Sequence, residues 1–170
     1  LWFPVDVSPS SRATIGGMTA TNSCGGRSIR YGIMRDNVLA IDAWLADGSL
    51  ASFGVFDEKA ALPKGRLGNI LPELLAIGRD NQAEIRDRFP KVLRRVGGYN
   101  IDALMPDAMA LRPGGKTGDG INLAHLLVGS EGTLAISKTI TLKLSPLPAK
   151  KMMGVCHFPT FYTVSYTHLR

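Results

Sequence analysis

Two pairs of glycines bracket a run of small and hydroxyl-bearing residues near the start of the chain. The run is Ala13-Thr14-Ile15-Gly16-Gly17-Met18-Thr19-Ala20-Thr21-Asn22-Ser23-Cys24-Gly25-Gly26. Paired glycines let backbone N–H groups turn toward a ligand, hydroxyls add donors, and a short helix beginning at Gly17 would point its N-terminus at the same place. Such a segment suits a pyrophosphate or the edge of a flavin. A tight turn before a helix of small residues packed on a sheet explains it equally well, because neither a G-x-G-x-x-G nor a Walker motif is present.

A second glycine-bracketed site, Gly129-Ser130-Glu131-Gly132-Thr133-Leu134, directly precedes a strand-like stretch. Glu131 lies between two glycines, where its backbone and its carboxylate can both reach a ligand. A turn that carries a solvated glutamate is the structural alternative. Neither site alone decides between ligand binding and packing.

Alternating apolar residues predict the strands that position these sites. Strands are expected over residues 1–7, 38–46, 49–56 and 133–144, with a turn at Ser8–Ser11 and a hairpin turn at Asp47-Gly48. The hairpin strands and the last strand should share one sheet and turn a common set of apolar residues to the core, which in the last strand is Leu134, Ile136, Ile140 and Leu142. The two glycine-bracketed sites should then lie side by side and face one cavity.

Helical periodicity dominates residues 69–96. The sequence predicts a break near Gly78 and a bend or an end at Pro90. One apolar face is expected before the break and another after it, made by Ile70, Leu74 and Ile77 and then by Ile85, Phe89, Val92 and Val96. A helical turn is expected within residues 121–128. Because strands and helices mix without a regular βαβ order, the sequence predicts an α+β fold.

Other polar residues are weaker candidates for a binding site. Tyr99-Asn100 could approach a ligand near the two glycine-bracketed sites. Lys116, in a glycine-rich loop within residues 105–120, resembles a phosphate cradle, but a solvated hairpin tip explains it better. His125 lies in an apolar run and is expected to be a hydrogen-bonded core histidine.

The composition is that of a globular chain with a basic excess. Its 170 residues are 45% hydrophobic and carry a net charge of +6. The basic residues form no run and interleave with no aromatic motif, which disfavours nucleic acid as a partner, and an anionic dinucleotide would use the positive charge equally well. Two distant cysteines favour a reducing compartment, and no apolar run is long enough to span a bilayer.

Taken together, the two glycine-bracketed sites resemble a known family. Residues 13–32 are similar to the "ATIGG…G…YG" stretch of the FAD-linked oxidases of the vanillyl-alcohol oxidase superfamily, and residues 129–136 to their "GSEGTLG(V/I)I" stretch. Within that superfamily the chain most resembles the D-2-hydroxy-acid dehydrogenases. Ala135 stands where the family usually has glycine, which still lets the backbone pass.

The resemblance implies which residues contact FAD. Carried over by position, the contacts fall on Ser8, Pro9, Ser10, Ser11, Arg12, Ala13, Thr14, Gly16, Gly17, Thr21, Asn22, Ser23, Cys24, Gly25, Glu131, Gly132, Thr133, Leu134, Ala135, Ile136 and Ser137. Cys24 is expected to be a small packed thiol beside the cofactor and not a covalent flavin ligand. No metal site is expected.

The resemblance also implies what this sequence leaves out. The family's "RGGGTS"-type pyrophosphate loop, its substrate cap and any CxxC pair are not found here. We therefore interpret residues 1–149 as part of an FAD-binding domain and residues 150–170 as the start of a cap region with a tail that could be non-native. The implied reaction converts a D-2-hydroxy acid to the 2-oxo acid, with the hydride equivalent passing to the flavin and a base outside the chain taking the hydroxyl proton.

Two alternatives remain open at this stage. The chain could belong to an oxidase of another alcohol or sugar in the same superfamily, or it could be a non-catalytic basic module that recruits an anionic partner. The sequence gives neither the hydroxy acid nor the electron acceptor. A cytoplasmic location, with contact to a membrane only through that acceptor, is the expectation.

Overall fold

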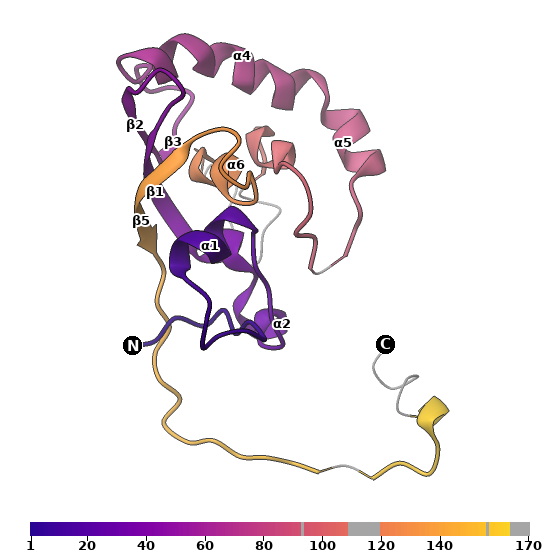
Figure 1. The fold of residues 1–170 in the computed structure, drawn as a ribbon. Helices are drawn as coiled ribbons and strands as arrows, with labels where there is room; N and C mark the ends of the chain where they lie inside the picture. The colour runs from indigo at the N-terminus through magenta and orange to yellow at the C-terminus, as the bar shows by residue number, and fades with distance from the viewer. Residues whose placement is uncertain (93, 109–119, 156, 164–170) are drawn as a thin grey trace.

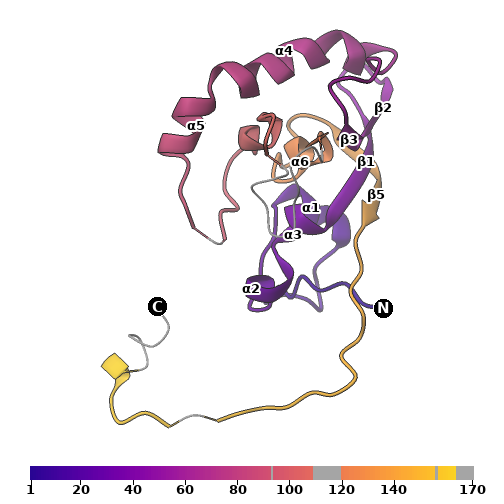
Figure 2. The same cartoon turned by 180° about the vertical axis from the view of Figure 1, so that it is seen from behind.

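The computed structural model describes residues 1–92, 94–108, 120–155 and 157–163. It has the α+β architecture expected from the sequence (Figure 1). In chain order the elements are α1 (Ile15–Ala20), α2 (Ser28–Tyr31), α3 (Met34–Asn37), β1 (Val38–Trp44), β2 (Leu50–Phe53), β3 (Val55–Phe56), α4 (Arg66–Asp80), α5 (Gln82–Arg88), the 3-10 helix η1 (Ile101–Leu104), β4 (Ile121–Asn122), α6 (Ala124–Leu127) and β5 (Ile136–Leu142). Helices α4 and α5 form an arch, and α6 lies between this arch and β1 in both views (Figures 1 and 2).

Strand β1 is the centre of a three-stranded antiparallel sheet in the order β2-β1-β5. Ile41 pairs with Phe53 on one side and with Ile140 on the other, so the predicted hairpin and the last strand do share a sheet. The register of β1 against β5 shifts between Val38 and Ala40. Such an irregularity reverses the side-chain alternation, which is why Val38 and Ile41 are both buried while Leu39 is exposed.

The turn between β1 and β2 forms as predicted. Gly48 has a φ of 79°, a backbone angle that glycine adopts without strain. The Ser49 hydroxyl and amide both donate to the Asp47 carboxylate, and these hydrogen bonds hold the pKa of Asp47 below its ordinary value.

The single return strand predicted over residues 49–56 is wrong in one respect. It divides at Gly54 into β2 and β3, because β3 leaves β1 to pair with β4, and the Gly54 carbonyl accepts a hydrogen bond from the Leu123 amide. The short strand β4 was not predicted. The helical turn expected within residues 121–128 is confirmed as α6.

The helical region is confirmed, but its break and its buried face are not as predicted. The break falls at Asn81, and Gly78 lies inside α4, where a Cβ atom would come within 2.2 Å of the Leu104 carbonyl oxygen. This glycine therefore permits close packing on η1 instead of ending a helix. The buried face of α4 is Leu67, Gly68, Leu71, Leu75 and Gly78, whereas Ile70 and Leu74 are half-buried and Ile77 is exposed. As expected, the helix α5 ends just before Pro90; Ile85 is buried, but Val92 lies beyond the helix and is exposed.

The strand predicted over residues 1–7 is also wrong. Only Trp2 pairs, through two backbone hydrogen bonds of 2.9 Å with Ser145. Pro4 has no N–H to donate to a ladder, and Val5 and Val7 instead pack into the main core. The turn at residues 8–11 is confirmed, since the Ser10 amide donates to the Val7 carbonyl.

The burial predicted for the last strand holds for only half of its residues. Ile140 and Leu142 pack against the core, but Leu134 and Ile136 are 38% and 68% exposed. The strand nevertheless exists, paired with β1 along its length. Leu134 lies before β5, and Ile136 pairs with Trp44, which is itself 41% exposed, so both residues fall outside the part of the strand that packs on the core.

Beyond β5 the chain leaves the body as an extended segment (Figure 1). In the part of the chain that the structure describes, no helix combines the length and the apolarity that crossing a bilayer requires. Lys116 and its glycine-rich loop, Cys156 and the end of the chain from residue 164 lie outside the described residues.

Candidate functional site

The first glycine-bracketed segment folds into the short helix α1. Thr14 is its N-cap and accepts a hydrogen bond of 3.1 Å from the Gly17 amide. Serine and threonine are favoured at this position because the side-chain oxygen satisfies an otherwise unpaired helix N–H. The helix thus begins at Ile15, two residues earlier than the sequence predicts.

Hydroxyl groups line a hollow of about 500 Å³ at this helix. The Thr21 hydroxyl lies 2.8 Å from that of Ser23, and the Thr14 hydroxyl caps the helix at the other side of the hollow. Among the described residues, the lining consists of Val7, Ser8, Pro9, Arg12, Ala13, Thr14, Gly17, Met18, Thr21, Ser23 and Cys24. With four hydroxyl side chains and one guanidinium, this lining can form hydrogen bonds with an anionic or carbonyl-bearing ligand.

The second glycine-bracketed site is joined directly to α1. The Gly129 amide donates to the Thr19 carbonyl and the Glu131 amide to the Ala20 carbonyl, each at 3.0 Å. Gly129 has a φ of 84°, and a Cβ atom there would come within 3.1 Å of the Asn22 Cβ. Two segments more than a hundred residues apart in the sequence therefore lie side by side, as predicted.

Comparison with known proteins agrees with this geometry. Residues 1–54, which hold all of α1 and its hollow, match the model of the FAD binding domain. These residues belong to an FAD-binding domain. FAD is accordingly the cofactor of this part of the protein.

Curated relatives extend the similarity of the FAD-binding domain along most of the chain. A probable mitochondrial D-lactate dehydrogenase of Danio rerio is 32% identical over 160 residues, which are 94% of this chain and 21% of that protein. A D-2-hydroxyglutarate dehydrogenase of Pantoea ananatis is 32% identical over 86% of this chain and 14% of that protein. The glycolate oxidase subunit GlcD of Bacillus subtilis is 26% identical over 89% of this chain and 20% of its own length. The chain spans about a seventh to a fifth of the relatives that it matches.

The FAD-binding domain gathers nine of the residues expected to contact the cofactor in the hollow at α1. They are Ser8, Pro9, Arg12, Ala13, Thr14, Gly17, Thr21, Ser23 and Cys24. Ser10 and Ser11 lie on the exposed turn beside it, and Gly16 faces open space, with no atom within 4 Å of an added Cβ. Gly25 has a separate reason to be glycine, because its Cβ would collide with the Asp6 carbonyl oxygen.

Glu131 is bonded to α1 through its backbone amide, but none of residues 131–137 is among the described residues that line the hollow. The expectation that both sites face one cavity is therefore met only as adjacency: among the described residues the lining comes from residues 7–24. The backbone N–H of Glu131 is already bound to Ala20, so this exposed residue can offer a ligand its acceptor oxygens but not its amide. Glu131 holds a φ of 52°, a left-handed conformation that is costly for a glutamate.

The residues present fit a flavin dinucleotide. The hollow offers hydroxyls and small side chains, and a Cβ atom on Gly17 would press on the Thr14 hydroxyl at 3.0 Å. Asn22, which is fully buried beside the hollow, keeps a side-chain nitrogen with no partner among the described residues. Buried donors without an acceptor are rare in native proteins, and each calls for an explanation such as a bound water, an ion or a ligand.

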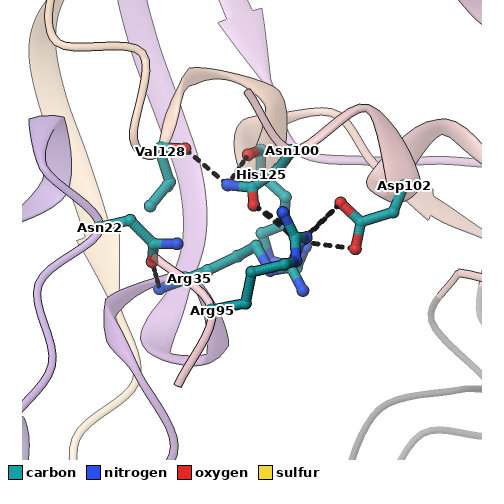
Figure 3. A network of polar contacts seen from close by, with 7 residues as sticks. All are labelled: Asn22, Arg35, Arg95, Asn100, Asp102, His125 and Val128. Carbon is teal, nitrogen blue, oxygen red and sulfur yellow. Dashed lines mark hydrogen bonds and ion pairs between the residues drawn. The ribbon is translucent and has the colours of Figure 1, made fainter. Parts of the chain in front are cut away.

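A buried polar network behind the two sites was not predicted. Figure 3 shows Arg35 and Arg95 converging on Asn100 and Asp102, with Asn22 and Val128 at the ends of the network. The sequence pointed to Asn100 only as a possible ligand contact, yet it is buried. His125 is a satisfied core histidine as expected, with its Nε2 atom 3.2 Å from both the Val38 carbonyl and the Asn122 amide.

A larger hollow, of about 800 Å³, lies between α2–α3 and the segment after α5. Arg35, Arg95 and Asp102 form part of its wall, but it contains none of the residues expected to contact FAD. Its size alone does not make it the cofactor site, because the match to the FAD binding domain covers the smaller hollow and only one wall of the larger one.

Proposed function

We propose that this chain supplies the FAD-binding part of a flavin-dependent dehydrogenase that oxidises a D-2-hydroxy acid to the corresponding 2-oxo acid. The observation that carries the proposal is the direct hydrogen bonding of the second glycine-bracketed site to α1. Helix α1 lies within residues 1–54, which match the model of the FAD binding domain. The names of the relatives, D-lactate and D-2-hydroxyglutarate dehydrogenase, support the substrate class.

When bound, FAD supplies the acceptor for the hydride equivalent that leaves the substrate carbon. The residues of this chain bind and orient it. The Thr14 hydroxyl lines the hollow and can donate to the cofactor. The Thr21 hydroxyl already donates to the Gly17 carbonyl and lies 2.8 Å from the Ser23 hydroxyl, so this pair can accept from the cofactor, as can the Glu131 carboxylate. The remaining contacts are proposed for the turn at Ser8–Ser11 and for the stretch from Gly132 to Ser137.

The division of the chain follows from the same proposal. Residues 1–149 would form the FAD-binding unit and residues 150–170 the start of the next region. The extended course of the chain after β5 supports this boundary (Figure 1). The hydroxy acid and the electron acceptor would then bind outside residues 1–149, and the base that takes the hydroxyl proton would also lie there. We further propose a cytoplasmic location, with membrane contact only through the electron acceptor.

The test is made on the full-length protein that contains this chain. It should purify with the visible absorbance of an oxidised flavin, release FAD on denaturation, and be bleached by D-lactate, D-2-hydroxyglutarate or glycolate without oxygen. The L-enantiomers of the two chiral acids serve as controls and should leave the flavin oxidised. A flavin that is bleached only by another alcohol or a sugar would replace the proposed substrate class, and a protein without flavin would contradict the proposal as a whole.

A further inference from the structure

The side chain of Asn100 spans the space between η1 and the second glycine-bracketed site. Its amide nitrogen donates to the Val128 carbonyl at 2.7 Å and to the His125 carbonyl at 3.2 Å (Figure 3). Only 1% of the residue is exposed. Val128 is the residue directly before Gly129, so this amide holds the backbone where the second site begins.

The amide has only one orientation that its neighbours accept. Its oxygen receives hydrogen bonds from the Arg35 guanidinium at 2.9 Å and the Arg95 guanidinium at 3.3 Å. Two donors on one side and two carbonyls on the other fix which end is oxygen and which is nitrogen. Asp102 pairs with both arginines, at 2.9 Å and 2.6 Å, and thereby fixes the guanidinium groups themselves.

The same network reaches the first glycine-bracketed segment. The backbone amide of Arg35 donates to the Asn22 side-chain oxygen at 3.0 Å. On the opposite side, the Tyr99 hydroxyl lies 2.8 Å from the Thr133 hydroxyl, at the far end of the second site. Residues 99–102 thus contact both ends of the second site, and Arg35 contacts the first.

We propose that Asn100 is a positioning residue of the FAD site. It fixes the backbone at Val128, and Tyr99 fixes it at Thr133, so that the loop between them stays docked on α1 through the Gly129 and Glu131 amides. This inference rests on the proposed function, because it assigns a role in holding that cofactor. Asn100 need not touch FAD to do so.

Charge makes the Asn100→Asp variant a sharp test. Arg35, Arg95 and Asp102 together carry one net positive charge in a site whose side chains are 13–20% exposed. An aspartate at position 100 keeps the shape of the side chain and neutralises that charge, so the two arginines retain their acceptor. It loses the donor, however, and turns a carboxylate oxygen toward two carbonyls. The loop should therefore be released while the ion pairs that help to hold the fold remain.

The experiment compares Asn100→Asp with Asn81→Asp in the full-length protein. Asn81 is the matched control, since its amide also donates to a backbone carbonyl, that of Ile77, but at an exposed helix end. Two lost hydrogen bonds predict FAD binding weaker by roughly tenfold or more in Asn100→Asp, with a shifted visible spectrum of the bound flavin, and wild-type behaviour in the control. Wild-type affinity and spectrum in Asn100→Asp would overturn the proposal.

Hydrogen exchange measured without FAD separates this inference from the proposed function. Amides of residues 128–133 should exchange faster in Asn100→Asp than in the wild type, whether or not the protein binds flavin. A wild type that binds no FAD contradicts the proposed function alone. If Asn100→Asp does not fold, Tyr99→Phe decides, because it removes only one exposed hydroxyl and with it the contact to Thr133. This variant should release FAD faster than the wild type. Release of FAD at the wild-type rate, together with wild-type hydrogen exchange over residues 128–133, would overturn the positioning role.

Discussion

Gly17 lies in α1, lines the hollow and is next to the hydroxyl of the N-cap residue Thr14. A Cβ atom there would lie 3.0 Å from the Thr14 hydroxyl, so a valine must displace either that cap or the ligand. We predict that Gly17→Val weakens FAD binding by about tenfold or more, or ~1.4 kcal/mol. Valine has a better helix propensity than glycine, so α1 itself should persist.

Flavin content per polypeptide after gel filtration measures this effect in the full-length protein. Gly26→Val is the matched control, because a Cβ atom at Gly26 meets nothing within 4 Å and Gly26 does not line the hollow. The control should retain flavin. Normal flavin content in Gly17→Val would remove α1 from the cofactor site.

Single residues were predictable from the sequence where their chemistry is local. Thr14, Thr21 and Ser23 were expected at the ligand from their type and spacing; they line the hollow, and their contact with FAD stays a prediction. Arg35 and Asp102 were not expected to matter, since they are 67 residues apart and an ion pair at that separation leaves no local pattern. Gly25 was expected to contact the ligand, but a Cβ atom at this position would collide with the Asp6 carbonyl oxygen. The need for glycine there comes from a distant backbone segment, which no sequence motif reveals.

At the scale of elements, the packing of α4 on η1 depends on Gly78. An added Cβ atom would meet the Leu104 carbonyl oxygen at 2.2 Å and its carbonyl carbon at 2.4 Å, and backbone cannot yield as a flexible side chain can. We predict that Gly78→Ala destabilises the protein by roughly 1–3 kcal/mol despite the helix propensity of alanine. Chemical denaturation without FAD measures it.

The control for this prediction is Gly16→Ala, which also replaces a helical glycine. A Cβ atom at Gly16 meets nothing within 4 Å, so the variant should be neutral or more stable by up to about 1 kcal/mol. Equal effects of the two substitutions would show that α4 does not rely on close contact with η1.

The periodicity of apolar residues predicted whether a segment is a helix or a strand better than it predicted which face of that segment is buried. The helical period over residues 69–96 was correct for α4 and α5, but the sequence could not show that the core lies along Leu67, Leu71 and Leu75, because Ile70, Leu74 and Ile77 make an equally apolar stripe. The register shift near Leu39 likewise depends on the partner strand β5, more than a hundred residues away in the sequence. Both features are decided by tertiary contacts that choose between locally equivalent alternatives.

At the scale of the whole molecule, an apolar row crosses the exposed side of the sheet. Trp44 pairs with Leu50 on one strand and with Ile136 on the other, and the three residues are 41%, 48% and 68% exposed. Contiguous exposed apolar surface favours association. The alternation of apolar residues predicted which strands share the sheet, and nothing in it shows how much of the second face is covered.

The last prediction concerns the 170-residue chain expressed alone. It should bind FAD weakly or not at all and show no 2-hydroxy-acid dehydrogenase activity. The described lining of the hollow at α1 comes only from residues 7–24, and the additional glycine-rich pyrophosphate loop that the family resemblance implies is not in this sequence. The exposed row at Trp44 should also make the isolated chain self-associate, and Ile136→Thr should reduce that association because it keeps a strand-favouring residue and removes the most exposed apolar member. Flavin fluorescence during titration with FAD measures the binding, and sedimentation measures the association. Saturable submicromolar binding by this chain would show that it holds a complete FAD site, and the proposed need for further segments would then be wrong.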